Sequence, residues 1–167
     1  MRSHLLLCVP LLALAVHASA QTTQTTSDDF RVSIDITKAC EIIAANDISF
    51  GEVSPSASQP TATGNVQVAC STGTDYTLGL NYGQNEESSV RHMQHTTLGA
   101  TAPLIPYTLS SNSGHSVPWT NSGVGLVSGT GTGVDDAISH PVYARATLAG
   151  TEPPGTYEDL VTATLTF

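Results

Sequence analysis

Residues 161–167 read Val-Thr-Ala-Thr-Leu-Thr-Phe, an unbroken alternation of apolar and hydroxyl side chains. Side chains alternate between the two faces of a β-strand, so this period predicts a half-buried strand over residues 157–167. An immunoglobulin-like sandwich normally has one further strand after such a strand. Because the apolar pattern continues to the last residue, an open edge with an exposed strip of core is expected. The residues predicted to line this acceptor edge are Tyr157, Val161, Ala163, Leu165 and Phe167.

A second alternating stretch could fill such an edge. Residues 30–37 read Phe-Arg-Val-Ser-Ile-Asp-Ile-Thr and follow a polar leader at residues 21–29. We call the four apolar side chains of this stretch the comb: Phe30, Val32, Ile34 and Ile36. Two interpretations fit the pattern equally. Residues 30–36 are a donor strand that inserts into the next molecule by strand addition, or they are the half-buried first strand of their own complete sandwich.

Further alternating runs, separated by turn-forming residues, predict an all-β antiparallel sandwich of seven or eight strands. No stretch reads as a convincing amphipathic helix. Besides the two stretches above, strands are expected at residues 40–44, 48–53, 66–70, 76–82, 104–109 and 141–148. The run at 104–109 contains Pro106, which lacks a main-chain donor and predicts an edge strand. Residues 83–102 and 110–136 are expected to be loops.

The first twenty residues have the pattern of a secretory signal. An apolar run ends in Ala18-Ser19-Ala20, which suits signal peptidase cleavage between Ala20 and Gln21. A lipoprotein signal using Cys8 fits less well, because the residue before this cysteine is a leucine where a small residue is needed. The pattern therefore predicts Sec-dependent export to the periplasm.

Charge and hydropathy narrow the class of partner. The chain has five Lys and Arg residues against fourteen Asp and Glu residues, a formal net charge of −9. Such a chain repels nucleic acid and anionic membrane surfaces, so neither is expected as a partner. No later stretch approaches the roughly 18 apolar residues of a membrane helix, so direct membrane insertion is not expected. Residues 30–167 are predicted to form one exported domain.

Two cysteines, Cys40 and Cys70, remain once the signal is removed. An even pair in an oxidising compartment predicts a structural disulfide. Closing a loop of about 30 residues would stabilise the fold by roughly 3–4 kcal/mol. Two isolated cysteines are too few ligands for a metal site.

No group of residues has the pattern of a catalytic or cofactor site. His92 and His95 are spaced as in some metal sites, but without a helix or a third ligand they are expected to be loop histidines facing solvent. Glu158 and Asp159 are neighbours that point to opposite faces of a strand, so a turn role is expected. Residues 129–133 are glycine-rich but lack the lysine of a phosphate loop, and a flexible loop is expected. We therefore predict a protein that is not an enzyme and holds no metal or cofactor.

Short motifs in a characteristic order run through the chain. They are Lys38-Ala39-Cys40 after the comb, Ile48-Ser49-Phe50-Gly51, residues 64–70, residues 75–78, Arg91-His92-Met93, residues 106–109, Trp119, Pro141-Val142-Tyr143 and residues 154–159. Together they resemble the spore coat U family, which includes archaic (Csu-type) chaperone–usher pilins.

The resemblance implies an incomplete immunoglobulin-like fold completed by donor-strand exchange, with Cys40 and Cys70 as the family's disulfide pair. It implies folding on a periplasmic chaperone and assembly by an outer-membrane usher. The product would be a surface fibre of copies of this chain and related pilins, serving adhesion or biofilm formation. Residues 30–36 are then the donor, because the polar leader is not hydrophobic.

Two other functions remain open. A structural coat protein of a spore or cyst would use the same linkage in a different place. A monomeric secreted sugar-binding module would instead have a complete sandwich with an aromatic platform for carbohydrate. The candidate platform residues are Tyr76, Tyr82, Tyr107, Tyr143 and Trp119, although core positions are more common for such side chains in sandwiches.

Overall fold

The computed structural model describes residues 21–167, and the expected signal sequence lies outside the described residues. Contacts divide the chain into a part that ends at Asp35 and a part from Ile36 to Phe167. Each part is considered by itself. The described residues include no helix with the length and apolar character of a membrane span.

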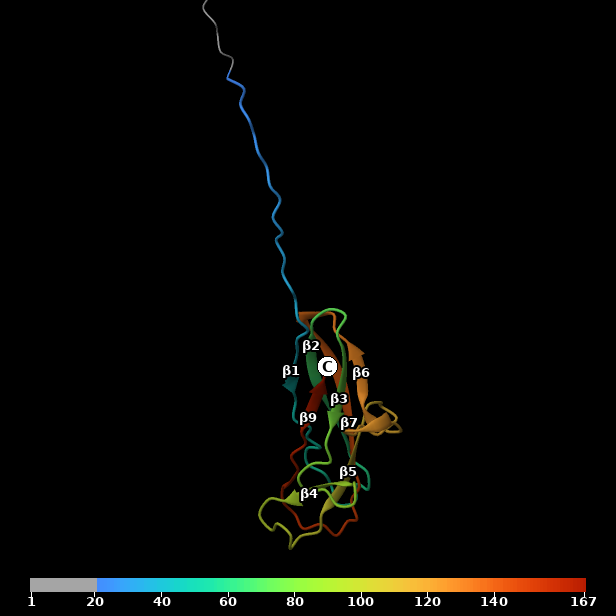
Figure 1. Ribbon diagram of the computed structural model, residues 1–167. Coiled ribbons are helices and arrows are strands. Elements are labelled where there is room, and N and C mark those ends of the chain that lie inside the picture. Colours follow the sequence, from blue (N-terminus) through green and yellow to red (C-terminus); the bar gives the residue numbers. More distant parts are fainter. Residues whose placement is uncertain (1–20) are drawn as a thin grey trace, which may run out of the picture. The chain divides into compact units, whose positions relative to one another are not determined.

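The part from Ile36 to Phe167 is an all-β sandwich of two antiparallel sheets (Figure 1). Its elements are β1 (Cys40–Ala45), β2 (Thr61–Cys70), β3 (Asp75–Leu80), β4 (Arg91–His95), β5 (Ile105–Ser110), the 3-10 turn η1 (Gly123–Gly125), β6 (Val127–Thr130), β7 (Gly133–Ala146), β8 (Tyr157–Glu158) and β9 (Ala163–Thr166). The larger sheet has the order β1-β2-β7-β5-β4-β8, and the smaller sheet has the order β6-β3-β9. The predicted fold class is confirmed.

The core lies between the two sheets and is built from the apolar faces of alternating strands. On β3, Tyr76, Leu78 and Leu80 are buried and face the larger sheet, whereas Asp75 is exposed. Trp119 is 1% exposed, and its indole N–H donates to the main-chain oxygen of Leu78 at 3.0 Å. This bond satisfies the only polar atom of the indole ring, which allows the ring to fill the centre of the sandwich.

The glycine-rich segment forms strands where a loop was predicted. Residues 127–130 are β6, and β7 begins at Gly133, well before the strand expected at residue 141. Gly129 lies opposite Tyr76 in the register, and a Cβ at this position would collide with the Tyr76 ring. A glycine is therefore needed for close packing, and its flexibility is not the reason for its presence.

Three further expectations were wrong. The strand with Pro106 is not at an edge, because β5 lies between β4 and β7. The main-chain oxygen of Pro106 accepts from Thr147 N–H at 2.9 Å just beyond the end of β7, so the missing proline donor falls where that ladder ends. Residues 91–95, expected in a loop, form β4, and residues 48–53, expected as a strand, form none. Ile48 and Phe50 nevertheless pack against the core.

The expected strand at residues 157–167 is split between the two sheets. β8 pairs with β4 through His95 and Tyr157, and β9 pairs with β3 through Leu78 and Leu165. The chain therefore crosses from the larger sheet to the smaller one within residues 159–162.

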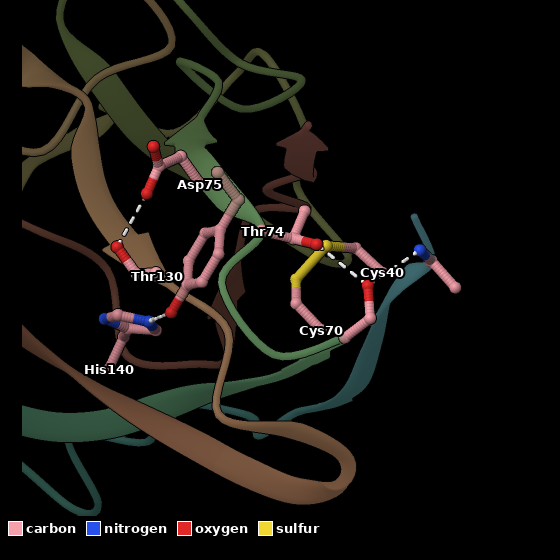
Figure 2. Close-up of a disulfide and its surroundings, with 9 residues drawn as sticks. Cys40, Cys70, Thr74, Asp75, Thr130 and His140 are labelled. Atoms are coloured by element: carbon pink, nitrogen blue, oxygen red, sulfur yellow. Dashed lines mark hydrogen bonds between the residues drawn. A yellow bond between two sulfur atoms is a disulfide. The ribbon is translucent and has the colours of Figure 1, made fainter. Parts of the chain in front are cut away.

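The disulfide between Cys40 and Cys70 joins β1 to β2 (Figure 2). The two residues lie directly opposite each other in the register and are 30 residues apart in the sequence. Cys70 is fully buried, and Cys40 packs against the core. The bond covalently fixes the end of β1, a strand that hydrogen-bonds to a neighbour on one side only.

Replacing both cysteines with serine should lower the thermal midpoint by about 10 °C. This estimate assumes a loss of roughly 3–4 kcal/mol for a loop of this length and about 3 °C per kcal/mol for a domain of this size. Thermal melts of purified wild-type and Cys40→Ser/Cys70→Ser protein measure the change. An unchanged midpoint would contradict a stabilising role for the disulfide.

Candidate functional site

Both sheets end at strands that lie near each other without pairing. β1 is an edge of the larger sheet, and β9 is an edge of the smaller sheet. Their Cα atoms approach within 8 Å, and the two strands lie side by side in Figure 1, but no ladder joins them. We call these two unpaired edges the β1/β9 seam. In a closed sandwich, a strand at this place would pair with both.

The outer side of β9 offers free main-chain groups over apolar side chains. Thr162 N–H and C=O both bond to Asn81, on the β3 side. Successive residues of a strand point their main-chain groups to opposite sides, so those of Ala163 and Leu165 point away from β3. Within residues 36–167, no main-chain hydrogen bond is made on that side. The side chains of Ala163 and Leu165 are half-buried against the core.

The opposite side of the seam is formed by β1. Cys40 and Ile42 are half-buried and face the core, whereas Glu41 and Ile43 are exposed. A bulge between Ile42 and Ala44 interrupts the register with β2. An added strand would therefore meet an apolar surface on both sides of the seam.

Four of the five predicted acceptor residues lie along the β9 edge or flank it: Val161, Ala163, Leu165 and Phe167. Phe167 is 51% exposed at the end of β9. The structure places Tyr157 elsewhere, on β8 beside β4, with its ring 4.9 Å from that of His95. Tyr157 therefore borders the far edge of the larger sheet.

The comb is exposed and lies outside any strand. Within residues 21–39 no strand forms, so the half-buried strand predicted at residues 30–37 is absent from this structure. The exposed fractions of the four comb side chains are 83–87%. Four large apolar side chains that alternate with polar ones and remain exposed need an apolar partner surface.

Asp159 is a half-buried anchor that sequence reasoning missed. Its Oδ1 accepts from the main-chain N–H groups of Gln84 and Asn85 at 2.8 and 3.1 Å and from Asn85 Nδ2 at 3.1 Å. Its Oδ2 accepts from the Tyr107 hydroxyl at 2.7 Å. Asp159 thus binds a loop and a strand that are both distant from it in the sequence. No local signal at Pro-Pro-Gly-Thr-Tyr-Glu-Asp would have identified these partners.

Asn81 completes the crossing between the sheets. Its Oδ1 accepts from Gly83 N–H at 3.0 Å and from Thr162 N–H at 2.8 Å, and its own N–H donates to Thr162 C=O at 3.0 Å. We call Asp159 and Asn81 the crossing anchors. Together they fix the chain where it enters β9, and therefore fix one side of the seam.

Arg91 supports the same region from inside the sandwich. Arg91 is 4% exposed, and its guanidinium donates to the main-chain oxygens of Asn81, Leu80 and Trp119, each at 2.8 Å. The guanidinium carbon also lies 5.2 Å from the centre of the Tyr82 ring. Burial lowers the pKa of Arg91, because removing the charge from water is costly.

Burial, with the hydrogen bond to Asp159 next in size, raises the pKa of Tyr107 far above its ordinary value. The phenol therefore stays protonated and remains a donor to Asp159 throughout the physiological pH range.

His92 and His95, the two histidines with metal-site spacing, make hydrogen bonds within the fold. His95 is buried, which corrects the expectation of a solvent-facing side chain. Its Nδ1 accepts from the N–H groups of Thr97 and Leu98 at 3.1 and 3.2 Å, so its proton lies on Nε2, 3.3 Å from Pro154 oxygen. His92 Nδ1 lies 3.1 Å from Val90 oxygen. Among residues 21–167, no cluster of three His, Cys, Asp or Glu side chains could hold a metal ion.

The chain is similar to one protein family in sequence and to a solved structure in fold. The Spore Coat Protein U domain model matches residues 26–164. A chain in the crystal structure of the CsuC-CsuE chaperone-tip adhesion subunit pre-assembly complex, from archaic chaperone-usher Csu pili of Acinetobacter baumannii, has a similar fold. The TM-score is 0.57 at 24% identity, over 79% of this chain and 40% of that chain. No curated protein sequence is significantly similar to this chain.

Removing the Asp159 carboxylate should loosen the crossing. Asp159→Ala deletes the acceptor of four hydrogen bonds, three of them part-buried, and should cost about 3 kcal/mol, or roughly 10 °C in thermal midpoint. Glu158→Ala is the matched control, because Glu158 is the exposed neighbour. Equal midpoints for the two variants would show that Asp159 does not anchor the crossing.

Acid should destabilise the fold through His140. Burial lowers the pKa of His140, and its Nε2 lies 2.8 Å from the Tyr76 hydroxyl. The unfolded chain therefore takes up a proton before the folded one does. This stabilisation is fully present above the ordinary histidine pKa of about 6.5 and is lost as the pH falls through the folded value.

Thermal midpoints at pH 7 and pH 5 test this dependence. The decrease on acidification should be smaller in His140→Gln than in the wild type. His92→Gln is the control, because the hydrogen bond between His92 Nδ1 and Val90 oxygen is exposed. A decrease of equal size in all three proteins would contradict the assignment.

Proposed function

Because the chain belongs to the Spore Coat Protein U domain family, we propose that it is a structural subunit of a secreted surface fibre built by the chaperone–usher pathway. Subunits join when the comb of one copy enters the β1/β9 seam of the next. The observation that carries this proposal is the pairing of an exposed apolar comb with a seam whose main-chain and apolar groups lack a partner among residues 36–167.

The dimensions of the two parts agree. A strand rises about 3.3 Å per residue, so residues 30–36 span about 23 Å and the six residues of β1 span about 20 Å. Main-chain hydrogen bonds to β9 would supply affinity, and alternate side chains entering the core would supply specificity. The polar residues between the comb positions, Arg31, Ser33 and Asp35, would then face solvent.

The energy available is large enough for a durable link. Each comb side chain is more than four-fifths exposed, and burying one contributes about 1.5–3 kcal/mol. Four such side chains give roughly 6–12 kcal/mol before the cost of ordering the segment, and strand pairing adds to this. Such a link should dissociate slowly and resist detergent without heat.

An unpaired seam also requires protection before assembly. The similar solved structure is a pre-assembly complex of a chaperone with a pilus subunit. By analogy, a periplasmic chaperone would cover the β9 edge of this chain until the donor strand of another copy, or of a related pilin, replaces it at an outer-membrane usher. Export would depend on the signal expected at residues 1–20, with cleavage between Ala20 and Gln21.

The alternatives have less support. A coat protein of a spore or cyst would use the same linkage and differ in location, so microscopy of labelled protein separates it from a fibre. A sugar-binding module requires exposed aromatic rings, but Tyr76, Tyr107 and Trp119 are at most 8% exposed. The fold is that of a structural pilus subunit, and we propose that the chain has no enzymatic activity.

Changing the apolar face of the comb should prevent polymerisation. Ile34→Asp would place a charge in the core of the neighbouring subunit, a cost of several kcal/mol. Ser33→Asp is the matched control, because it introduces the same side chain on the polar face of the same segment.

The measurement is a gel of surface extracts run in SDS with and without boiling. Wild type and Ser33→Asp should give a ladder that collapses on boiling to one band, and Ile34→Asp should give no ladder. A normal ladder from Ile34→Asp would eliminate the comb as the link between subunits.

A further inference from the structure

The chain is tethered between the comb and β1. Only two residues separate Ile36, the last comb residue, from Ala39. The main-chain oxygen of Ala39 accepts from Ser71 N–H at 2.8 Å, and Ala39 N–H donates to Ser71 Oγ at 3.1 Å. Both main-chain groups of Ala39 are therefore engaged on the β2 side.

Neighbouring contacts hold this tether in place. Ser71 Oγ lies 2.8 Å from the hydroxyl of Thr74, which is buried. The next residues in each strand are also linked. Cys40, which follows Ala39, is joined by the disulfide to Cys70, which precedes Ser71. The chain is therefore fixed to β2 at Ala39, three residues after the last comb residue.

A comb that entered its own seam could form an antiparallel hairpin with β1. The register of that hairpin decides whether the comb side chains point to the core or to solvent. Residues directly opposite each other in an antiparallel pair point to the same face. Cys40 and Ile42 face the core, and Glu41 is exposed. Ile36 and Ile34 must therefore lie opposite Cys40 and Ile42 to bury their side chains.

The structure opposes that pairing. It requires the three-residue loop Thr37-Lys38-Ala39, whose last residue usually adopts the left-handed conformation and is usually glycine. Ala39 carries a Cβ, and Ser71 holds both of its main-chain groups. A two-residue loop would place Ile34 opposite Glu41 and turn the comb toward solvent.

The other routes are also unfavourable. Pairing parallel to β1 needs a crossover of about a dozen residues, far more than the chain provides between Ile36 and Ala39. A five-residue loop over residues 35–39 would turn the remaining comb side chains back toward the core, but it would leave Ile36 in the loop and outside the seam.

Building on the proposed function, we infer that the Ser71 tether on Ala39 keeps each comb out of its own seam and reserves the seam for a second copy of this chain. A comb from a second copy is not tied to this β1 strand and can enter with all four side chains in phase. The tether thus selects fibres over self-closed monomers.

Lengthening the connection tests this inference. A twelve-residue Gly/Ser insertion between Thr37 and Lys38 lets the comb reach its own seam in either direction. The same insertion between Ser27 and Asp28 is the control, because it leaves the tether intact. Immunoblots of total cell protein, unheated and boiled, count both assembled and unassembled chains.

The first insertion should replace most of the ladder with one compact monomer band that shifts on boiling, and the control should keep the ladder. Adding Ile34→Asp to the first insertion should abolish the compact monomer. A ladder like that of the control, or loss of the protein without a compact monomer, would overturn the inference.

A point variant gives a second test without added length. Ala39→Gly with Ser71→Ala supplies the left-handed residue and removes the side-chain bond, so compact monomer should appear at the expense of the ladder. Its absence would count against the tether. Ile34→Asp in the otherwise wild-type chain separates the two proposals. If this variant has no ladder and the tests above fail, only the tether is contradicted. If this variant keeps its ladder, the proposed function itself is contradicted.

Discussion

The outer side of β9 has two needs at the same place: its free main-chain groups need a hydrogen-bonding strand, and its half-buried side chains need apolar cover. An unpaired strand edge attracts another strand, and an uncovered core strip attracts apolar side chains. Around Ala163 and Leu165 both conditions are met by one segment of alternating sequence. The comb has that alternation and is exposed along its whole length. This combination accounts for the proposed assembly by strand exchange.

The sandwich must keep both sides of the seam in position while no strand lies between them. On one side, the disulfide and Ser71 fix β1 to β2. On the other side, Asp159 and Asn81 fix the entry of β9, with Arg91 bound to main-chain oxygens beneath. These polar and covalent links stabilise the two strands in place of the core contacts that an additional strand would make. They join each side of the seam to its own sheet and do not cross the gap between β1 and β9, so an entering strand does not have to displace them.

The sequence predicted the fold class, the disulfide partners and the alternation of residues 161–167, because each depends on local pattern or on a simple count. It did not predict the role of Asp159, whose partners come from distant segments. It also missed β6, because a glycine that packs beneath Tyr76 looks the same in the sequence as a glycine in a loop. The strand predicted at residues 30–37 is absent from this structure, and alternation alone cannot say in which molecule such a segment will pair.

Photo-crosslinking from the comb tests the central claim most directly. A photoreactive amino acid at position 34 is activated in assembled surface protein, which is then boiled in SDS and digested. Assembly through the seam predicts a product of twice the subunit mass in which position 34 is joined to a peptide from β1 or β9. A crosslink confined to the monomer mass, or one joined to another surface, would contradict assembly through the β1/β9 seam.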